Sequence, residues 1–184
     1  MKDNSTVVTI HMVSSLNGLV SSVDDQLHEW MKSKYIYDLG RKLTGTDVAS
    51  FLDRIDCYII GTNTYRLTQE LGWPYGEKPV FLLSQSVQSS DIKSITVWSG
   101  TPEELLNDVI PSSYKNIWIA GGPMIVSSFL KKQLADELII TIAPAVIGSG
   151  RVFFESVDQS LSLELISHEV YSDGMIELAY KIHY

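Results

Sequence analysis

The sequence predicts an α/β protein built on a mostly parallel central sheet of about eight strands, with an antiparallel C-terminal edge. Apolar strand-like segments alternate with helix-like segments up to residue 132, which is the order of parallel strands joined by helices. The last three strand-like segments have no helix between them, so they should run antiparallel to one another. A chain of 184 residues can bury one sizeable core, and a single domain over residues 1–184 is expected.

In the first half of the chain, strands are expected at 6–13, 57–60, 79–84 and 95–98. Apolar residues recur at intervals of three and four between residues 26 and 43, which predicts a helix that Gly45 ends. Further helices are expected at 47–53 and 64–71. The segment SSLNGLVSSVDD contains the turn signal Asn17-Gly18, and both a mobile loop over a site and a plain connection are open. Its aspartates, Asp24 and Asp25, fit a helix start.

In the second half, Thr101, Pro102 and two following glutamates form a helix start signal. A strand at 116–120 leads through Gly-Gly-Pro into a helix that ends near Lys132. A long strand is expected at 137–147, and Gly148-Ser149-Gly150 is interpreted as a turn. Ser-Asp-Gly joins the last two strands, which predicts a hairpin.

Charge and composition exclude several classes of function. The chain carries 22 acidic and 14 basic residues, for a net charge of −8, and binding to nucleic acid or to an anionic membrane surface would need a basic face. The four histidines show no metal-ligand spacing with one another or with Cys57. No bound metal, nucleic acid or membrane is therefore expected.

The location is expected to be cytoplasmic. The N-terminal residues lack the apolar core of a secretory signal, and no apolar stretch approaches the roughly 20 residues of a membrane span. Cys57 is the single cysteine and lies in the apolar run IDCYIIG, so we interpret it as a small buried thiol rather than a reactive one.

The segment IWIAGGPMIVSSFL at 117–130 places two glycines and a proline between an apolar strand and a helical pattern. A helix that begins at Pro123 directs its unsatisfied N–H groups, and the positive end of its dipole, toward the carboxyl end of the strand. Glycines at 121 and 122 leave room for a phosphate against the backbone. These residues alone leave two interpretations open, a phosphate site and a close-packed turn.

Two more polar loops follow strands. Gly61-Thr62-Asn63-Thr64 enters a helix, and Thr62 or Asn63 would either cap that helix or donate hydrogen bonds to a phosphate. Leu83-Ser84-Gln85-Ser86 follows the next strand. Because the carboxyl ends of parallel strands meet at one edge of a sheet, three such loops would suit an extended ligand with several phosphates, such as a dinucleotide.

Taken together, the segments resemble the dihydrofolate reductase superfamily, and within it the reductase domain of bacterial riboflavin-biosynthesis deaminase-reductases. The resemblance is carried, in order, by SSLNGLV, CYIIGTNTY, GWPYGEKPVFLLSQS, IWIAGGPMIVSSFL and DELIITIAPAVIGSGRVFF, which cover nearly the whole chain. The zinc signature of the deaminase does not occur in the sequence, so a bifunctional enzyme is not expected.

The resemblance implies a dihydrofolate reductase-like three-layer sandwich with NADPH bound across the strand ends. It places the pyrophosphate against Gly121 and Gly122, whose peptide bond is often cis in this family, and the nicotinamide beside Asn17 and Gly18. The cofactor-binding residues that it implies are Asn17, Gly18, Gly61, Thr62, Asn63, Thr64, Leu83, Ser84, Gln85, Ala120, Gly121, Gly122, Pro123, Met124 and Ile125.

The chain departs from the family pattern in two places. Folate-reducing members usually carry a basic residue directly after the glycine matched by Gly61, where it binds the extra ribose phosphate of NADPH. This chain has Thr62, so NADH is not excluded. Riboflavin-pathway reductases bind a ribose phosphate with arginines in the next segment, but here Arg66 and Lys78 are its only cations and match no known clamp. Asp38 is interpreted as a solvated helix residue, not as the buried carboxylate of folate reductases.

The resemblance implies an NAD(P)H-dependent reductase that transfers a hydride to a small heterocyclic substrate. The most specific assignment is a 5-amino-6-(5-phosphoribosylamino)uracil reductase of riboflavin biosynthesis, with dihydrofolate reductase as the alternative enzyme. Trp30 and Tyr65 are candidates for substrate-binding aromatic walls, although core positions suit both equally. The sequence names no catalytic residue.

A non-catalytic nucleotide-binding dimer module is the alternative of another class, because Thr62 and the missing substrate clamp fit lost turnover. The resemblance also implies a homodimer. The candidate contacts are Ile140, Ile142, Val146, Phe153 and Phe154.

Overall fold

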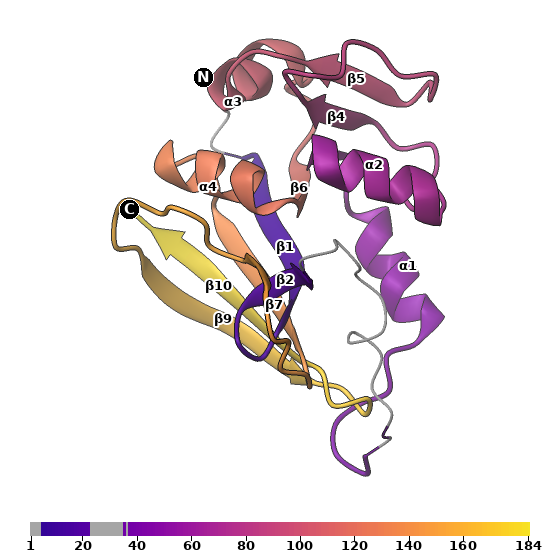
Figure 1. Ribbon diagram of the computed structural model, residues 1–184, viewed down its shortest axis with the longest axis vertical. Coiled ribbons are helices and arrows are strands. Elements are labelled where there is room, and N and C mark those ends of the chain that lie inside the picture. The colour runs from indigo at the N-terminus through magenta and orange to yellow at the C-terminus, as the bar shows by residue number, and fades with distance from the viewer. Residues whose placement is uncertain (1–4, 23–34, 36) are drawn as a thin grey trace.

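The computed structural model describes residues 5–22, 35 and 37–184. Eight strands form one sheet in the order β5-β4-β3-β6-β1-β7-β10-β9, and β2 and β8 form a two-stranded ribbon (Figure 1). The strands are β1 (Val7–Ser15), β2 (Leu19–Ser22), β3 (Cys57–Gly61), β4 (Val80–Leu83), β5 (Ile95–Trp98), β6 (Asn116–Gly121), β7 (Glu137–Ala143), β8 (Gly150–Val152), β9 (Ser162–Val170) and β10 (Ile176–His183). The helices are α1 (Gly45–Asp53), α2 (Thr62–Leu71), α3 (Pro102–Glu104), the π-helical turn η1 (Leu105–Val109) and α4 (Pro123–Lys131).

The direction of the strands confirms the fold class predicted from the sequence. The strands from β5 to β7 in the sheet order are all parallel to their neighbours. β10 runs antiparallel to β7 and to β9, which makes the C-terminal edge antiparallel as expected. The carboxyl ends of six parallel strands therefore lie along one edge of the sheet.

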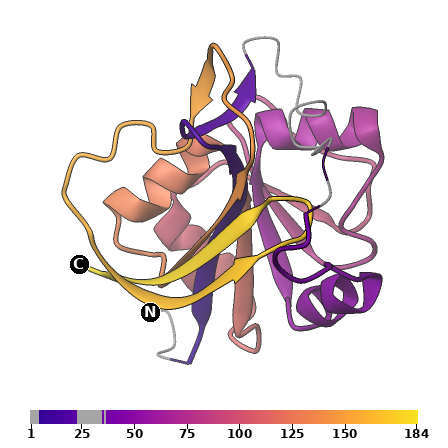
Figure 2. The same ribbon diagram turned by 90° about the horizontal axis from the view of Figure 1, so that it is seen from below.

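Helices cover both faces of this sheet, which gives the expected three layers (Figure 2). On one face, the side chains of η1 and α4 pack on β1, β3 and β6, with Leu105, Phe129 and Ile119 completely buried. On the other face, Phe51 and Leu52 of α1 and Tyr65 of α2 pack against β3 and β4. Apolar residues alternate along β6, so this strand contributes to both cores.

The helix predicted over 26–43 is not present in the part that the structure describes. Residues 37–43 are irregular and lie against the β9–β10 hairpin, where the backbone N–H of Arg41 donates to the carbonyl of Val170 at 2.9 Å. The separate helix predicted at 47–53 is present as α1, and it begins at Gly45 because Thr44 and Asp47 form a reciprocal capping box. Gly45 thus starts a helix where the sequence pattern predicted that it would end one.

A second correction concerns the segments around the turn signal Asn17-Gly18 and around Gly148-Ser149-Gly150: the chain does turn or bend at 16–18 and 148–149, but strands follow directly. Residues Leu19–Ser22 and Gly150–Val152 pair as the antiparallel ribbon β2–β8. The sequence pattern missed the ribbon because each strand is very short and its partner lies far away along the chain. Asp24 and Asp25, interpreted as helix-start residues, lie outside the described residues.

Cys57 is fully buried in β3, as expected, and burial raises the pKa of its thiol to about 12. At pH 8 only about one such thiol in ten thousand is a thiolate, the reactive form. We therefore predict that iodoacetamide leaves the native protein unmodified and modifies it completely in urea, with mass spectrometry as the readout. Rapid modification of the folded protein would contradict the buried position.

Candidate functional site

The carboxyl ends of β3 and β6 lie side by side, and the chain leaves them toward opposite faces of the sheet. Ile60 of β3 pairs with Gly121 of β6, after which β3 continues into α2 and β6 continues into α4 (Figure 1). In open α/β sheets, a point where neighbouring connections diverge in this way forms the crevice that binds ligands. The structure therefore brings together two of the loops singled out in the sequence, 61–64 and 121–125.

Both helices at this point begin without a side-chain cap. Gly61 is the N-cap of α2 and Gly122 is the N-cap of α4, and neither helix start has a side-chain capping hydrogen bond. A Cβ at position 61 would lie 2.8 Å from Cγ1 of Ile125, so glycine is needed for the two helix starts to approach this closely. The free N–H groups and dipole ends of both helices therefore converge on one edge, which favours an anion.

The Gly-Gly bend lies between α2 and β1. The peptide bond between Gly121 and Gly122 is cis, as the resemblance implied, and Gly121 has a φ of 129°. A Cβ on Gly121 would lie 3.3 Å from Oγ1 of Thr64 and 3.8 Å from Sδ of Met12. No hydrogen bond of the Thr64 hydroxyl is found in the part of the chain that the structure describes. This hydroxyl is therefore available to a ligand at the bend.

The loop after β4, called the β4 loop, is linked to α2 by the buried side chain of Ser84. Thr62 Oγ1 donates to Ser84 Oγ at 2.8 Å, and the same Ser84 oxygen accepts from the backbone N–H groups of Ser86 and Val87 at 3.2 and 2.9 Å. Ser84 is only 5% exposed. Its side chain therefore shapes the loop instead of facing a ligand.

The other predicted cofactor residues differ in what they can offer. Leu83 is buried and Ala120 packs in the core, so only their backbone is available. Gln85 is exposed and donates to the Ser99 carbonyl. Asn63 and Met124 are exposed at the starts of the two helices. Pro123 occupies the first position of α4, where it removes no hydrogen bond.

The ladder between β1 and β6 ends next to this point, which leaves an opening in the hydrogen-bonded pairing of the sheet. β1 pairs with β6 only as far as Ile10 and Ile119, although β1 runs on to Ser15 beside β7. Just beyond, Trp118 Nε1 donates to the carbonyl of His11 at 2.9 Å and bridges the separating strands. The carboxyl-terminal part of β1 therefore has no ladder partner on its β6 side.

The loop above this opening is held by Asn17. Its Oδ1 accepts from the Ser15 hydroxyl at 2.8 Å, and its Nδ2 donates to the carbonyl of Ile147 at 2.8 Å. Gly18 accepts a backbone hydrogen bond from Phe153. Asn17 thus fastens the β1–β2 turn to the segment between β7 and β8, and Gly18 fastens it to Phe153 directly after β8.

Sequence reasoning missed a cluster around His11 on the α1 face of the sheet. The His11 ring stacks on Trp118 with 5.3 Å between centroids and meets Phe51 edge-on. Its Nε2 lies 3.2 Å from Oγ1 of Thr141, and Glu177 is 3.5 Å away. The hydrogen bond from His11 holds the pKa of Glu177 below its usual value. Strand alternation could have placed His11 on this face, but only the fold brings Glu177 to it.

The structure separates the residues proposed for the substrate side. Trp30 lies outside the described residues. Tyr65 is 6% exposed in the core, and its hydroxyl lies 2.9 Å from Ser90 Oγ. The structure therefore supports the core interpretation of Tyr65, because its ring has little surface to offer a substrate. Asp38 is exposed, in agreement with its interpretation as a solvated residue.

Arg66 and Lys78, the two cations considered for a substrate clamp, have different surroundings. Lys78 donates to the carbonyls of Leu52 and Asp53 at 2.6 and 3.2 Å, and also to that of Ile55. It therefore adds hydrogen bonds to carbonyl groups at the C-terminal end of α1 and just beyond it. Arg66 is exposed on α2.

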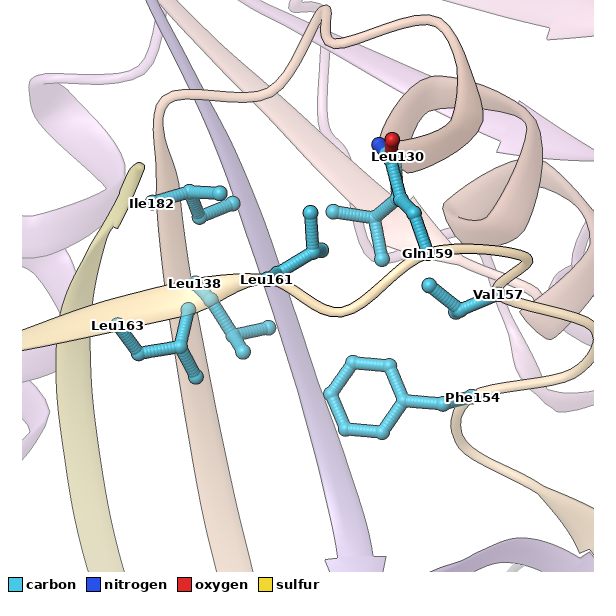
Figure 3. A pocket seen from close by; sticks show the side chains of 8 residues that line it. All are labelled: Leu130, Leu138, Phe154, Val157, Gln159, Leu161, Leu163 and Ile182. Atoms are coloured by element: carbon cyan, nitrogen blue, oxygen red, sulfur yellow. The ribbon is translucent and has the colours of Figure 1, made fainter. Parts of the chain in front are cut away.

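A separate pocket of about 170 Å³ lies at the opposite end of the sheet (Figure 3). It is lined by Leu130, Leu138, Phe154, Val157, Gln159, Leu161, Leu163 and Ile182. These side chains come from the end of α4, the start of β7, the segment leading into β9, the start of β9 and the end of β10. An almost entirely apolar lining lacks the polar groups that would orient a nucleotide, so this pocket is not the dinucleotide site.

Among the described residues, no helix has the length and apolar character needed to cross a membrane. Within the same residues, no group of three or more His, Cys, Asp or Glu side chains is placed to hold a metal ion.

The sequence profile of the RibD C-terminal domain matches residues 57–176. The chain belongs to this family. The matched residues run from the start of β3 to the start of β10 and include both diverging loops and the Gly-Gly bend. Family membership supports a reductase function of the riboflavin-pathway, pyrimidine reductase type.

Two proteins of Bacillus subtilis (strain 168) are similar along most of their length. The uncharacterized protein YwjB is 27% identical over 158 residues, which is 85% of this chain and 87% of YwjB. The uncharacterized protein YyaP is 25% identical over 143 residues, which is 71% of this chain and 76% of YyaP.

Solved structures show the same fold. A putative riboflavin biosynthesis protein from Shewanella sp. PV-4 has a TM-score of 0.82 at 24% identity, over 97% of this chain and all of that one. A pyrimidine reductase-like protein from Corynebacterium diphtheriae has a TM-score of 0.68 at 19% identity, over 98% and 93% of the two chains. A diaminohydroxyphosphoribosylaminopyrimidine deaminase/5-amino-6-(5-phosphoribosylamino)uracil reductase from Thermotoga maritima has a TM-score of 0.66 at 15% identity, over 96% of this chain and 56% of that one.

Proposed function

We propose that this protein is an NADPH-dependent reductase that transfers a hydride to a small heterocyclic substrate. One observation carries the proposal: the uncapped starts of α2 and α4 meet at the divergence of β3 and β6. Gly61 and Gly121 themselves carry no side chain there, and the donor groups of the two helix starts would suit a dinucleotide pyrophosphate. Membership of the RibD C-terminal domain family supports the same function.

The residues of this chain would bind the dinucleotide, orient it and shield it from water. The N–H groups of both helix starts would hold the pyrophosphate, with the Thr64 hydroxyl beside the bend. The opening between β1 and β6, under the turn braced by Asn17, would receive the nicotinamide half. When bound, the reduced nicotinamide supplies the hydride for an unsaturated carbon or imine, and the chain fixes its orientation.

For the substrate we propose 5-amino-6-(5-phosphoribosylamino)uracil or a close pyrimidine, with dihydrofolate as the second candidate. The family and the reductase-like neighbours support the first. The opening between β1 and β6 borders the α1 face, where His11, Trp118 and Phe51 form an aromatic floor. A planar heterocycle would pack on such rings.

The test is to mix the purified protein with NADPH and follow nicotinamide fluorescence, then to add pyrimidines and pterins and follow loss of the reduced nicotinamide. Micromolar binding with turnover of a phosphoribosylamino-pyrimidine is the expected result. Turnover of dihydrofolate alone would show that the substrate is dihydrofolate and not the pyrimidine, while the proposed hydride transfer would still hold. Binding without any oxidation would favour a non-catalytic nucleotide-binding module, and absence of binding to NADPH and NADH would overturn the proposal.

We further propose that residues 1–184 form one cytoplasmic domain. The central strand β1 pairs with β6 on one side and β7 on the other, so the two halves of the chain share one sheet. The buried Cys57 suits a reducing compartment.

We also propose a homodimer, with β9 as the contact. β9 is the outer strand of the sheet, and Leu163, Leu165 and Ile166 on it are 41 to 54% exposed. A long edge strand with exposed apolar side chains can pair with another chain, because its free N–H and C=O groups attract another strand. Among the contacts suggested by the sequence, Ile140 packs on the core and Phe153 is buried. The remaining suggested residues are half-buried Ile142 and the exposed Val146 and Phe154.

Sedimentation should therefore show a dimer that Ile166→Lys converts to a monomer, because a charge on the shared edge would be desolvated. Val146, which is 72% exposed after β7, is the matched site, and Val146→Lys should leave the dimer intact. A monomeric wild-type protein at micromolar concentration would contradict the dimer. If Val146→Lys gave a monomer and Ile166→Lys left the dimer intact, the contact would lie at Val146 instead of at β9.

A further inference from the structure

A second pocket, of about 290 Å³, lies between α1 and the amino-terminal ends of the central strands. Val7, Asn116 and Glu137 line it, and they are the first residues of β1, β6 and β7. The proposed dinucleotide site lies at the carboxyl ends of the parallel strands. This pocket is therefore at the other end of the sheet and separate from the proposed dinucleotide site.

Aromatic rings form one wall of the pocket. Phe51 of α1 and Trp118 of β6 both line it and meet edge-on, with 5.3 Å between their ring centroids. Ile139 of β7 adds aliphatic surface. All three side chains are only partly buried, so some of their apolar surface remains in contact with water. A flat or apolar group that covers this surface would be stabilised by its burial.

Arg54, the residue directly after α1, brings a positive charge to the pocket. Its guanidinium carbon lies 5.8 Å from the centroid of the Phe51 ring, a cation–π contact that holds the side chain against the aromatic wall. Within the described residues, the Arg54 side chain forms no ion pair and no hydrogen bond. A guanidinium donates two parallel hydrogen bonds to a carboxylate. Arg54 is therefore suited to bind a carboxylate that enters the pocket.

Glu137 brings a negative charge to the same pocket from β7. Thr9 lies opposite Glu137 in the register of β1 and β7, and its hydroxyl donates to Oε2 of Glu137 at 3.2 Å. Lys181 is the neighbour on β10, but no ion pair joins these two described residues. Because a carboxylate can accept about four hydrogen bonds, Glu137 keeps acceptor capacity for an ammonium group.

The two charges do not neutralise each other. No ion pair is formed between Arg54 and Glu137, both of which lie in the described part of the chain. Arg54 leads into β3, and in the sheet β3 is separated from β7 by β6 and β1. Three strand spacings correspond to roughly 14 Å between the backbones. The pocket thus presents a positive charge at one side and a negative charge at the other, with aromatic rings between them.

We propose that this pocket binds a small zwitterion that has a carboxylate at one end, an ammonium group at the other and a flat or apolar part between them. The carboxylate binds Arg54, the ammonium group binds Glu137, and the middle packs on Phe51 and Trp118. The volume lies just below the roughly 300–1,000 Å³ of pockets for drug-sized ligands, so a molecule with one ring fits. The inference goes beyond the proposed reductase function and does not rest on it.

The experiment is an NMR titration of the ¹⁵N-labelled full chain with 4-(aminomethyl)benzoic acid, which carries the two charges on opposite ends of one ring. The indole N–H of Trp118 is the reporter, because this ring lines the pocket. Two matched probes each lack one charge: 4-methylbenzoic acid and 4-methylbenzylamine. We expect a saturable shift with the zwitterion, and roughly 3- to 5-fold weaker binding of each singly charged probe, as is usual for ion pairs near the surface.

Variants assign each charge to its residue. In Arg54→Gln the zwitterion should bind no more tightly than 4-methylbenzylamine, since the carboxylate has lost its partner. In Glu137→Gln it should bind no more tightly than 4-methylbenzoic acid. Arg66→Gln and Glu70→Gln make the same charge changes at exposed positions of α2 and should leave all three affinities unchanged.

Three results would overturn the inference: no saturable shift of Trp118 with the zwitterion, equal affinity of wild type for the zwitterion and either singly charged probe, or shifts confined to residues 61–64 and 121–125. The proposed reductase function is tested separately by NADPH binding, which Arg54→Gln and Glu137→Gln should not change. If wild type bound the zwitterion but no dinucleotide, this inference would stand and the proposed function would fail.

Discussion

Gly121→Ala is expected to weaken NADPH binding at least about 10-fold and to lower the free energy of unfolding by about 1–3 kcal/mol. The residue has a φ of 129°, a conformation that residues with a Cβ rarely adopt. The added Cβ would also lie 3.3 Å from Thr64 Oγ1. Alanine therefore shifts the bend away from the position that brings both helix starts to the same edge. Fluorescence titration and urea unfolding measure the two effects.

Two further glycine variants show whether binding is lost by blockage or by unfolding. A Cβ at Gly122 would lie 3.6 Å from Thr64 Oγ1, an ordinary contact, so Gly122→Ala should keep its stability and lose affinity. A Cβ at Gly148 meets nothing within 4 Å, and Gly148→Ala should behave as wild type. Normal NADPH affinity in both Gly121→Ala and Gly122→Ala would show that no pyrophosphate lies at the bend.

Ser84→Ala should lower the free energy of unfolding by about 2–4 kcal/mol, because each buried donor that loses its acceptor costs about 1–3 kcal/mol. The Ser84 oxygen accepts from the Thr62 hydroxyl and from the backbone N–H groups of Ser86 and Val87. Without it, the β4 loop loses its link to α2, and NADPH affinity should fall as well. Urea unfolding gives the stability change and titration gives the affinity.

The control is Ser86→Ala, since Ser86 is exposed in the same loop and its side chain has no such role. A double-mutant cycle with Thr62→Val isolates the bond between Thr62 and Ser84, and we expect a coupling of about 1 kcal/mol. Additive effects of the two substitutions would mean that this hydrogen bond contributes nothing to stability.

Much of the fold follows from short-range patterns. Apolar runs located the strands, and the alternation with helices predicted the parallel sheet and its antiparallel edge. The helix starts at Thr101-Pro102 and at Gly122-Pro123 were readable because a capping residue or a proline marks the local backbone. The helix predicted at 26–43 failed in its described part, because contacts of residues 37–41 with the β9–β10 hairpin outweigh local periodicity.

The sequence by itself determined which residues suit the candidate site: glycines at 61, 121 and 122 followed by helical segments. The suitability of these glycines depends only on local backbone geometry, so each strand-loop-helix segment could be interpreted by itself. Only the tertiary structure decided that β3 and β6 are neighbours whose helices diverge, that Ser84 binds Thr62, and that Lys78 holds α1. These contacts join residues 22 to 61 positions apart in the chain. Strand order and side-chain partners are set by packing of the whole sheet, which no local pattern encodes.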